Sequence, residues 1–95
     1  NVPVEFTIGN PYPNPFNGNV QFSIYMLKES SVSIDVIDLS GKRAKRLYKG
    51  NLSTGNHNFN WHGKDSSGNQ VASGVYYIKV SGKSSEDWRP VTFVK

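Results

Sequence analysis

The sequence has 95 residues, with 36% hydrophobic residues and no cysteine. This length suits one domain with a thin core and leaves little room for a catalytic cleft between lobes, and the lack of cysteine excludes disulfides and thiolate-bound zinc. The formal charge of +4 draws the surface modestly toward anionic partners, and without a run of about 18 apolar residues we expect no transmembrane segment.

The chain up to Val36 contains three runs in which apolar residues recur at every second position. This period predicts half-buried strands rather than helices. The runs are Val4, Phe6 and Ile8; Val20, Phe22, Ile24 and Met26; and Val32, Ile34 and Val36. In the third run, Ser33 and Asp35 are expected to face away from the core. The turn-forming residues from Asp38 to Lys42 then predict a hairpin.

The strand pattern continues in the second half of the chain. In the run from Lys42 to Lys49, Ala44 and Leu47 stand at an odd separation, so we expect a bulge in a fourth strand. The remaining predicted elements are a polar connector from Gly50 to Gly55, a fifth strand around His57, Phe59 and Trp61, a surface loop from Gly63 to Gln70, a central sixth strand from Val75 to Val80, and a seventh strand from Trp88 to Val94. Seven short strands separated by turns predict an all-β fold, an immunoglobulin-like antiparallel β-sandwich with Greek-key connections.

An unusual proline-rich string runs from Asn10 to Asn17 with the sequence NPYPNPFN. Its three prolines at alternating positions fix φ and remove main-chain donors. We therefore expect a rigid connector between the first two strands, with Tyr12 and Phe16 capping one end of the core.

This string resembles the YPNPFN signature of the C-terminal sorting domain family of the type IX (Por) secretion system, whose fold is an immunoglobulin-like sandwich. Further similar stretches follow in the family's order: Val32 to Gly41; Gly55, His57 and Trp61; Gly63, Asp65 and Gly68; Val71 to Tyr76; Lys79; and the terminal Lys95. The resemblance covers the chain from Val2 to Lys95. The sequence departs from the family pattern at Gly18-Asn19 and at His62, where an aspartate is usual.

The resemblance implies a single domain over residues 1–95 that forms the C-terminal part of a larger secreted protein. It implies a non-catalytic signal that directs its parent protein through the periplasm to the outer membrane or cell surface. The implied partners are the outer-membrane secretion machinery, a sortase-like peptidase and the parent cargo domain, and we expect a monomer. The residues expected to carry the signal are Gly74, Val75, Tyr76, Lys79 and Lys95.

Two other functions stay open at this point. The family is also similar to the immunoglobulin-like domain of the flagellar hook-capping protein, which suggests a structural role in that assembly. The chain could also serve as an accessory structural or carbohydrate-binding module of a secreted hydrolase or adhesin. Trp88 is the best candidate for an exposed aromatic side chain in that case.

The candidate residues for metal binding and catalysis do not form a convincing site. His57 and His62 are five residues apart and would face opposite sides of a continuous strand, and the sequence has no cysteine or third histidine to complete a zinc site. The loop from Asp65 to Asn69 lacks the acidic density of a calcium loop, and no serine sits in a nucleophile elbow. We therefore expect no enzyme, no metal site and no cofactor.

The densest basic run could form a patch for an anionic partner. It consists of Lys42, Arg43, Lys45, Arg46 and Lys49. Without interleaved aromatic residues, it does not predict nucleic-acid binding. The alternative interpretation is that these charges protect an edge strand from pairing with other chains.

Overall fold

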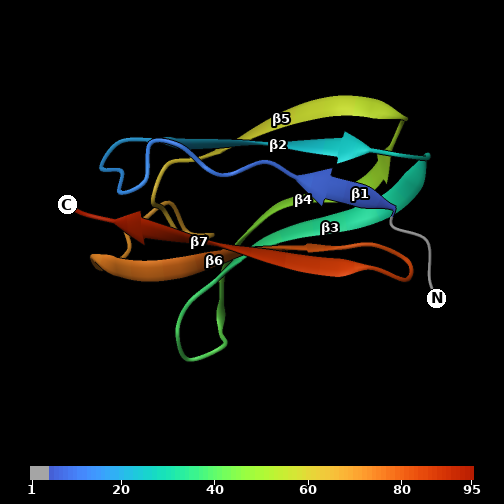
Figure 1. The fold of residues 1–95 in the computed structure, drawn as a ribbon. Coiled ribbons are helices and arrows are strands. Elements are labelled where there is room, and N and C mark those ends of the chain that lie inside the picture. The colour runs from blue at the N-terminus through green and yellow to red at the C-terminus, as the bar shows by residue number, and fades with distance from the viewer. Residues whose placement is uncertain (1–4) are drawn as a thin grey trace.

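A computed structural model describes residues 5–95, which form seven strands in two sheets packed face to face (Figure 1). The strands are β1 (Phe6–Ile8), β2 (Val20–Met26), β3 (Ser30–Ile37), β4 (Arg43–Leu52), β5 (Gly55–Trp61), β6 (Gly74–Ser81) and β7 (Glu86–Phe93). Residues 5–95 contain no helix, and therefore none of the length and hydropathy needed to cross a membrane. Val4, predicted in the first strand, lies outside the described residues.

The two sheets have the strand orders β1-β2-β5 and β4-β3-β6-β7, and neighbouring strands are antiparallel throughout. The chain crosses from one sheet to the other after β2, after β4 and after β5. This arrangement confirms the predicted all-β immunoglobulin-like sandwich of seven strands. It also places β6 between β3 and β7, as expected for the central sixth strand.

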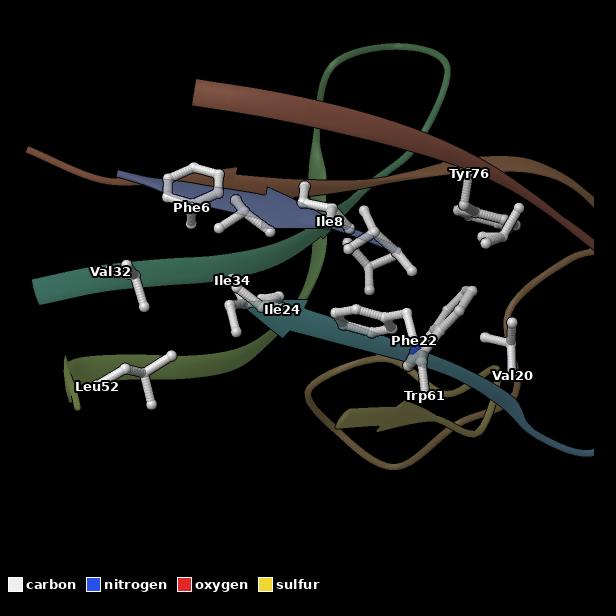
Figure 2. Packing of buried hydrophobic residues seen from close by; sticks show 14 of the residues in the cluster. Phe6, Ile8, Val20, Phe22, Ile24, Val32, Ile34, Leu52, Trp61 and Tyr76 are labelled. Atoms are coloured by element: carbon white, nitrogen blue, oxygen red, sulfur yellow. The ribbon is translucent and has the colours of Figure 1, made fainter. Parts of the chain in front are cut away.

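The core is the layer of side chains between the two sheets (Figure 2). From β2, the alternate residues Val20, Phe22, Ile24 and Met26 all point into it, while Gln21 and Tyr25 are exposed. The facing sheet contributes fully buried residues from three strands: Ile34, Val36, Ile78, Val80, Val91 and Phe93. Each such side chain adds about 1.5–3 kcal/mol to folding, so the alternation seen in the sequence accounts for most of the core.

The fourth strand contains two bulges. Tyr48 pairs with Ile34 and Arg46 with Asp35, so Leu47 has no partner, and a second shift leaves Ala44 unpaired in the same way. Both unpaired residues pack partly buried against the core. The predicted bulge is therefore confirmed. Together the two bulges turn Ala44 and Leu47, apolar residues at an odd separation, toward the same side of the strand.

The prediction of a polar connector from Gly50 to Gly55 is wrong for most of this segment, which belongs to strands β4 and β5. β4 continues through this stretch to Leu52, which pairs with Ser30 and is buried in the core. Only Ser53 and Thr54 remain between β4 and β5. Pairing with β3 holds the segment extended, an influence that its own polar composition does not reveal.

The predicted hairpin turn between β3 and β4 is confirmed. One carboxylate oxygen of Asp38 accepts hydrogen bonds from the Ser40 hydroxyl at 2.6 Å, the Ser40 amide at 2.9 Å and the Lys42 amide at 3.0 Å. These bonds, the Ser40 hydroxyl first, hold the pKa of Asp38 below its usual value. The turn is therefore fixed by its own side chains.

Tyr12 does not cap the core as predicted, although Phe16 does. Phe16 is buried, whereas Tyr12 is 60% exposed. The main chain of Tyr12 exchanges two hydrogen bonds with Gln21, at 2.9 and 2.8 Å. Directly paired residues point their side chains to the same face of a sheet, and the Gln21 side chain points outward. Tyr12 is therefore held on the outer surface.

Candidate recognition surfaces

Aromatic residues from separate parts of the sequence gather at one end of the sandwich, where Figure 2 shows Trp61 beside Tyr76 and Val20. The ring centroid of Phe16 lies 5.5 Å from that of Trp61 and 5.1 Å from that of Phe93. Trp61 in turn contacts Tyr76 edge-on at 5.3 Å. We call Phe16, Trp61, Tyr76 and Phe93 the end cluster. Three of its four members belong to the motifs that carry the sequence resemblance.

The polar atoms of the end cluster are paired with nearby loops. The Trp61 indole donates a hydrogen bond to the Lys64 carbonyl at 2.9 Å, and the Tyr76 hydroxyl donates one to the Ala72 carbonyl at 2.7 Å. Burial, and then the negative charge of Asp38, raise the pKa of Tyr76. Gly63 adopts a φ of +72°, and an added Cβ would lie 2.7 Å from the Phe93 ring. Only glycine fits at this position.

The proline-rich string covers one half of the outer edge of β7. The Asn14 side chain donates a hydrogen bond to the Pro90 carbonyl at 3.0 Å and accepts one from the Thr92 amide at 2.9 Å. The Phe16 main chain then bonds the Thr92 carbonyl and the Val94 amide, both at 2.9 Å. The Asn14 amide thus makes the pair of bonds that a neighbouring strand would make. This part of the edge is closed.

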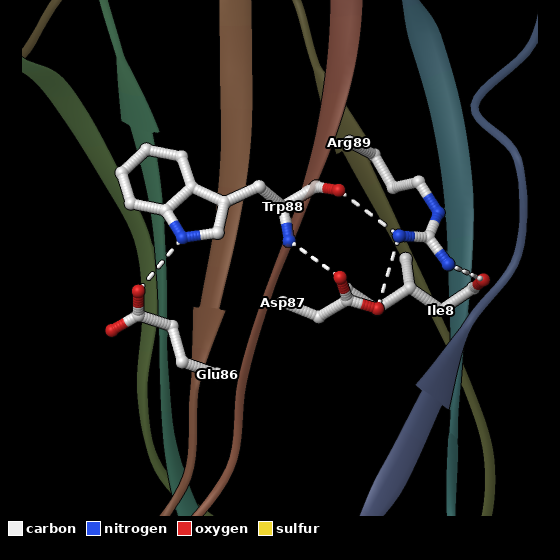
Figure 3. A network of polar contacts seen from close by, with 5 residues as sticks. All are labelled: Ile8, Glu86, Asp87, Trp88 and Arg89. Carbon is white, nitrogen blue, oxygen red and sulfur yellow. Dashed lines mark hydrogen bonds and ion pairs between the residues drawn. The ribbon is translucent and has the colours of Figure 1, made fainter.

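Side chains close the other half of the same edge (Figure 3). The Trp88 amide donates to the Asp87 carboxylate at 2.9 Å, and the Trp88 carbonyl accepts from Arg89 at 2.9 Å. Asp87 and Arg89 are themselves paired at 3.0 Å, and Arg89 also reaches the Ile8 carbonyl in the other sheet at 3.3 Å. The network leaves no outward polar group of Trp88 unpaired.

Replacing Asn14 by alanine is expected to lower the free energy of unfolding by about 1–3 kcal/mol. The change leaves the Pro90 carbonyl and the Thr92 amide without partners, each worth about 0.5–1.5 kcal/mol when paired. Urea unfolding followed by circular dichroism measures the loss. The Asn17→Ala variant is the matched control, because Asn17 is an exposed asparagine in the same string. Equal midpoints for the two variants would contradict the role given to Asn14.

The residues predicted to carry a sorting signal do not form one surface. Tyr76 points into the core, whereas Val75 and Lys79 point to the outer face of the same strand. Gly74 pairs with Phe93 near the C-terminus, and the Lys95 amide bonds the Ser73 hydroxyl at 3.0 Å. Gly74, Val75 and Lys95 thus share the end of the sandwich that holds the end cluster, while Lys79 lies farther along β6.

Lys79 belongs instead to a patch around Trp88 on the outer face of β6 and β7. Its ammonium lies 5.2 Å from the Trp88 ring centroid and 3.8 Å from the Glu86 carboxylate. The Trp88 indole donates to Glu86 at 2.7 Å, and Tyr77 contacts its ring edge-on. Trp88 is 39% exposed, as expected for this residue. Its partners hold the ring in one position.

The basic run is divided between two sides of the edge strand β4. Arg43 and Arg46 approach the same oxygen of Asp35, at 3.8 and 2.9 Å. These two arginines cover Asp35, which is nearly buried although it faces away from the core. Lys45 lines a recess toward the other sheet, and Lys49 lies on the outer face. Lys42 lies in the hairpin turn before the strand. The position of β4 at a sheet edge fits the edge-protection interpretation.

Glu5 was not among the candidate functional residues found in the sequence, yet it is the most buried acidic residue within residues 5–95. It is 1% exposed and accepts hydrogen bonds from the Ser30 hydroxyl at 2.9 Å and from the amides of Ser84 and Ser85 at 2.8 and 3.0 Å. The Ser84 bond is the largest cause that lowers the pKa of Glu5 to about 2, against the opposing effect of burial. The sequence gives no indication of these partners, because two of them are main-chain amides near the other end of the chain.

The two histidines lie in different environments. His57 is half-buried, as expected, and its Nε2 lies 2.8 Å from the Ser53 carbonyl, while His62 is exposed in the turn after β5. Among residues 5–95 there is no group of three or more His, Asp or Glu placed to hold a metal ion.

The sequence of residues 10–86 matches the family model described as "FlgD Ig-like domain". No curated protein matches the sequence. Among solved structures, the chain is similar to part of dimeric latent PorU from Porphyromonas gingivalis, with a TM-score of 0.65 and 13% identity over 96% of this chain and 10% of that one.

Two further solved structures are similar in fold. FlgD from Xanthomonas campestris, whose description concerns hook capping in flagellar assembly, has a TM-score of 0.62 and 19% identity over 93% of this chain and 66% of its own. The DNA glycosylase AlkC from Pseudomonas fluorescens, solved bound to DNA, has a TM-score of 0.52 and 15% identity over 99% of this chain and 32% of its own. The chain thus spans only a part of each of these proteins.

Proposed function

The chain belongs to the FlgD Ig-like domain family, and from this premise we propose that it is a non-catalytic sorting domain for type IX secretion. In this role, outer-membrane secretion machinery recognises the folded domain on an exported bacterial protein. The cargo domain of that protein then reaches the medium or the cell surface, where a sortase-like peptidase removes the sorting domain.

One observation carries this proposal. The motifs that resemble the sorting-domain family are far apart in the sequence, but their residues Phe16, Trp61, Gly63 and Tyr76 meet at one end of the sandwich. The exposed residues Tyr12, Val94 and Lys95 belong to segments joined at this same end. The buried motif residues therefore hold together the end of the sandwich that carries these three exposed residues. The recurrence of the fold as a tenth of the PorU chain fits a module within a much longer protein.

A role in the flagellar hook cap is the second candidate. The family description and the likeness to FlgD from Xanthomonas campestris favour it. In that role the domain would associate with hook subunits and would need no terminal position. The combination of motifs, the proline-rich string included, favours sorting, because together they resemble the sorting domains over nearly the whole chain.

Fusing the chain to the C-terminus of a periplasmic reporter, in a bacterium with type IX secretion, is expected to move the reporter outside the cell. Replacing Tyr12 by serine should reduce export several-fold. The change removes an exposed ring at the end of the sandwich that holds the end cluster, and it does not touch the core. Export is measured as reporter activity in the medium and on whole cells. The combined Lys79→Ala and Lys95→Ala change tests the two predicted signal lysines in the same assay.

Tyr25→Ser is the matched control, because Tyr25 is an exposed tyrosine at the other end of β2. Each variant must melt as the unchanged chain does, by circular dichroism. A reporter that stays in the periplasm, or one that is exported equally well with the domain at its N-terminus, would contradict the proposal. Export without the domain would favour an accessory module instead.

A further inference from the structure

The sandwich has four edge strands, and three of them are blocked. An open edge strand presents unpaired N–H and C=O groups that can pair with another chain, and proteins commonly block such edges. β7 is closed by the proline-rich string and by Asp87 and Arg89, as described above. β1 has only three residues, and its Ile8 carbonyl accepts a bond from Arg89. β4 carries two bulges, a run of cations, and a bond from the Ser66 amide to the Ala44 carbonyl at 3.1 Å.

The fourth edge strand, β5, has none of these devices. Its seven residues contain no proline and no Lys, Arg, Asp or Glu, and they pair with β2 without a register shift. Within residues 5–95, the main chain of β5 makes no hydrogen bond outside its ladder with β2. Figure 1 shows β5 at the margin of its sheet, with β2 on one side only.

The register identifies which groups of β5 are open. Gln21 exchanges both of its main-chain bonds with Tyr12, so it faces away from β5. Because the bonding direction alternates along an antiparallel strand, Val20, Phe22 and Ile24 are the β2 residues that bond β5. The outward N–H and C=O groups of β5 therefore belong to three exposed residues, Asn56, Asn58 and Asn60.

A recess beside this edge would receive a side chain from an added strand. It has a volume of about 120 Å³, and its lining includes the apolar Leu47 and Trp61 together with Lys45, His62 and Lys64. Side chains of an added strand alternate between the two faces of the sheet. Those opposite His57, Phe59 and Trp61 would point to the inner side, where the recess and the half-buried Phe59 lie.

We propose that the β5 edge binds an extended acidic segment of a partner protein, which adds a fourth strand to the sheet β1-β2-β5. Main-chain bonds to the three asparagines would give affinity, and an apolar side chain in the recess would give specificity. The charges select the acidic partner, since neither Lys45 nor Lys64 takes part in an ion pair within residues 5–95. A second copy of the chain that paired through its own β5 would supply no acidic residue, because that strand contains none. This proposal does not depend on the sorting role.

An isotope-labelled sample of the whole chain, titrated with a short extended peptide that carries both valine and glutamate on the same face, at positions i and i+2, tests the proposal by nuclear magnetic resonance. We expect chemical-shift changes centred on β5 and slowed amide exchange at Asn56, Asn58 and Asn60. A peptide with lysine in place of glutamate should bind at least about tenfold more weakly, because it meets the cations of the recess. Equal binding of the two peptides, or shift changes centred on another edge, would overturn the proposal.

Two variants of one residue sharpen the test. Asn58→Pro removes an outward donor and leaves the ladder with β2 intact, as Pro90 does in the edge strand β7. It should weaken peptide binding about tenfold, whereas the matched variant Asn58→Thr keeps the donor and should bind as the unchanged chain does. Unchanged binding by Asn58→Pro would overturn the proposal. A dimer in sedimentation that Asn58→Pro abolishes would also overturn it, because the occupant would then be a second copy.

Discussion

Replacing Trp61 by alanine is expected to cost about 3–5 kcal/mol of unfolding free energy, a large loss for a domain of this size. Substitutions of this size in a well-packed core leave a cavity and remove many contacts. Trp61 is 1% exposed and packs against Phe16, Tyr76 and Phe93. A domain of this length has about 0.05–0.15 kcal/mol of stability per residue, so the variant should unfold at a much lower urea concentration. Circular dichroism at increasing urea measures the shift.

Trp88→Ala is the matched control, because it removes the other tryptophan from a partly exposed position on β7. Its expected cost is about 1 kcal/mol, mainly from the lost contacts with Tyr77 and Lys79. If Trp61→Ala cost no more than Trp88→Ala, the end cluster would not hold the sandwich together as described.

Replacing Glu5 by glutamine is expected to lower the free energy of unfolding at pH 7 by about 1–3 kcal/mol. The carboxylate pairs three donors from Ser30, Ser84 and Ser85 that glutamine cannot satisfy equally, and an unpaired buried donor costs about this much. These bonds tie the segment before β1 to the β6–β7 turn. Gly82 leaves room for the carboxylate, since a Cβ there would lie 2.7 Å from it.

The same substitution should change how stability depends on pH. The pKa of Glu5 is lowered in the folded chain from 4.5 to about 2. The bonds therefore contribute fully above about pH 4.5, and their contribution is lost as the pH falls from there toward 2. Urea unfolding at pH 7, 4 and 2.5 should show the difference between Glu5→Gln and the unchanged chain shrinking at each step. A constant difference would contradict this role, and Glu29→Gln, at an exposed glutamate, should show almost none.

Strands could be predicted from the sequence wherever one face is buried and the other is exposed to solvent. β2 shows this pattern throughout, because Val20, Phe22, Ile24 and Met26 alternate with polar or exposed residues. The end of β4 could not be predicted in this way. Gly50 and Asn51 are poor strand formers, and they are extended only because β3 supplies their bonding partners. Tertiary pairing thus overrode local preference in this segment.

The candidate surfaces were less predictable than the fold. Tyr12 and Phe16 were both expected to cap the core, but only Phe16 is buried there. The structural roles of Asn14 and Glu5 could not be predicted from the sequence. Each side chain bonds main-chain groups that are more than 70 residues away. Polar residues of this kind look like ordinary loop residues until the chain is folded around them. The open edge of β5 likewise depends on sheet order, which no local pattern determines.

Native-state amide hydrogen exchange of the whole chain tests most directly the claim that β7 is a closed edge of the sandwich and β5 is an open one. We expect slow exchange at Thr92 and Val94, whose amides bond Asn14 and Phe16 although β7 is an edge strand. We expect fast exchange at Asn56, Asn58 and Asn60. Fast exchange at Thr92 and Val94, or protection of the three asparagine amides in the free chain, would contradict this claim.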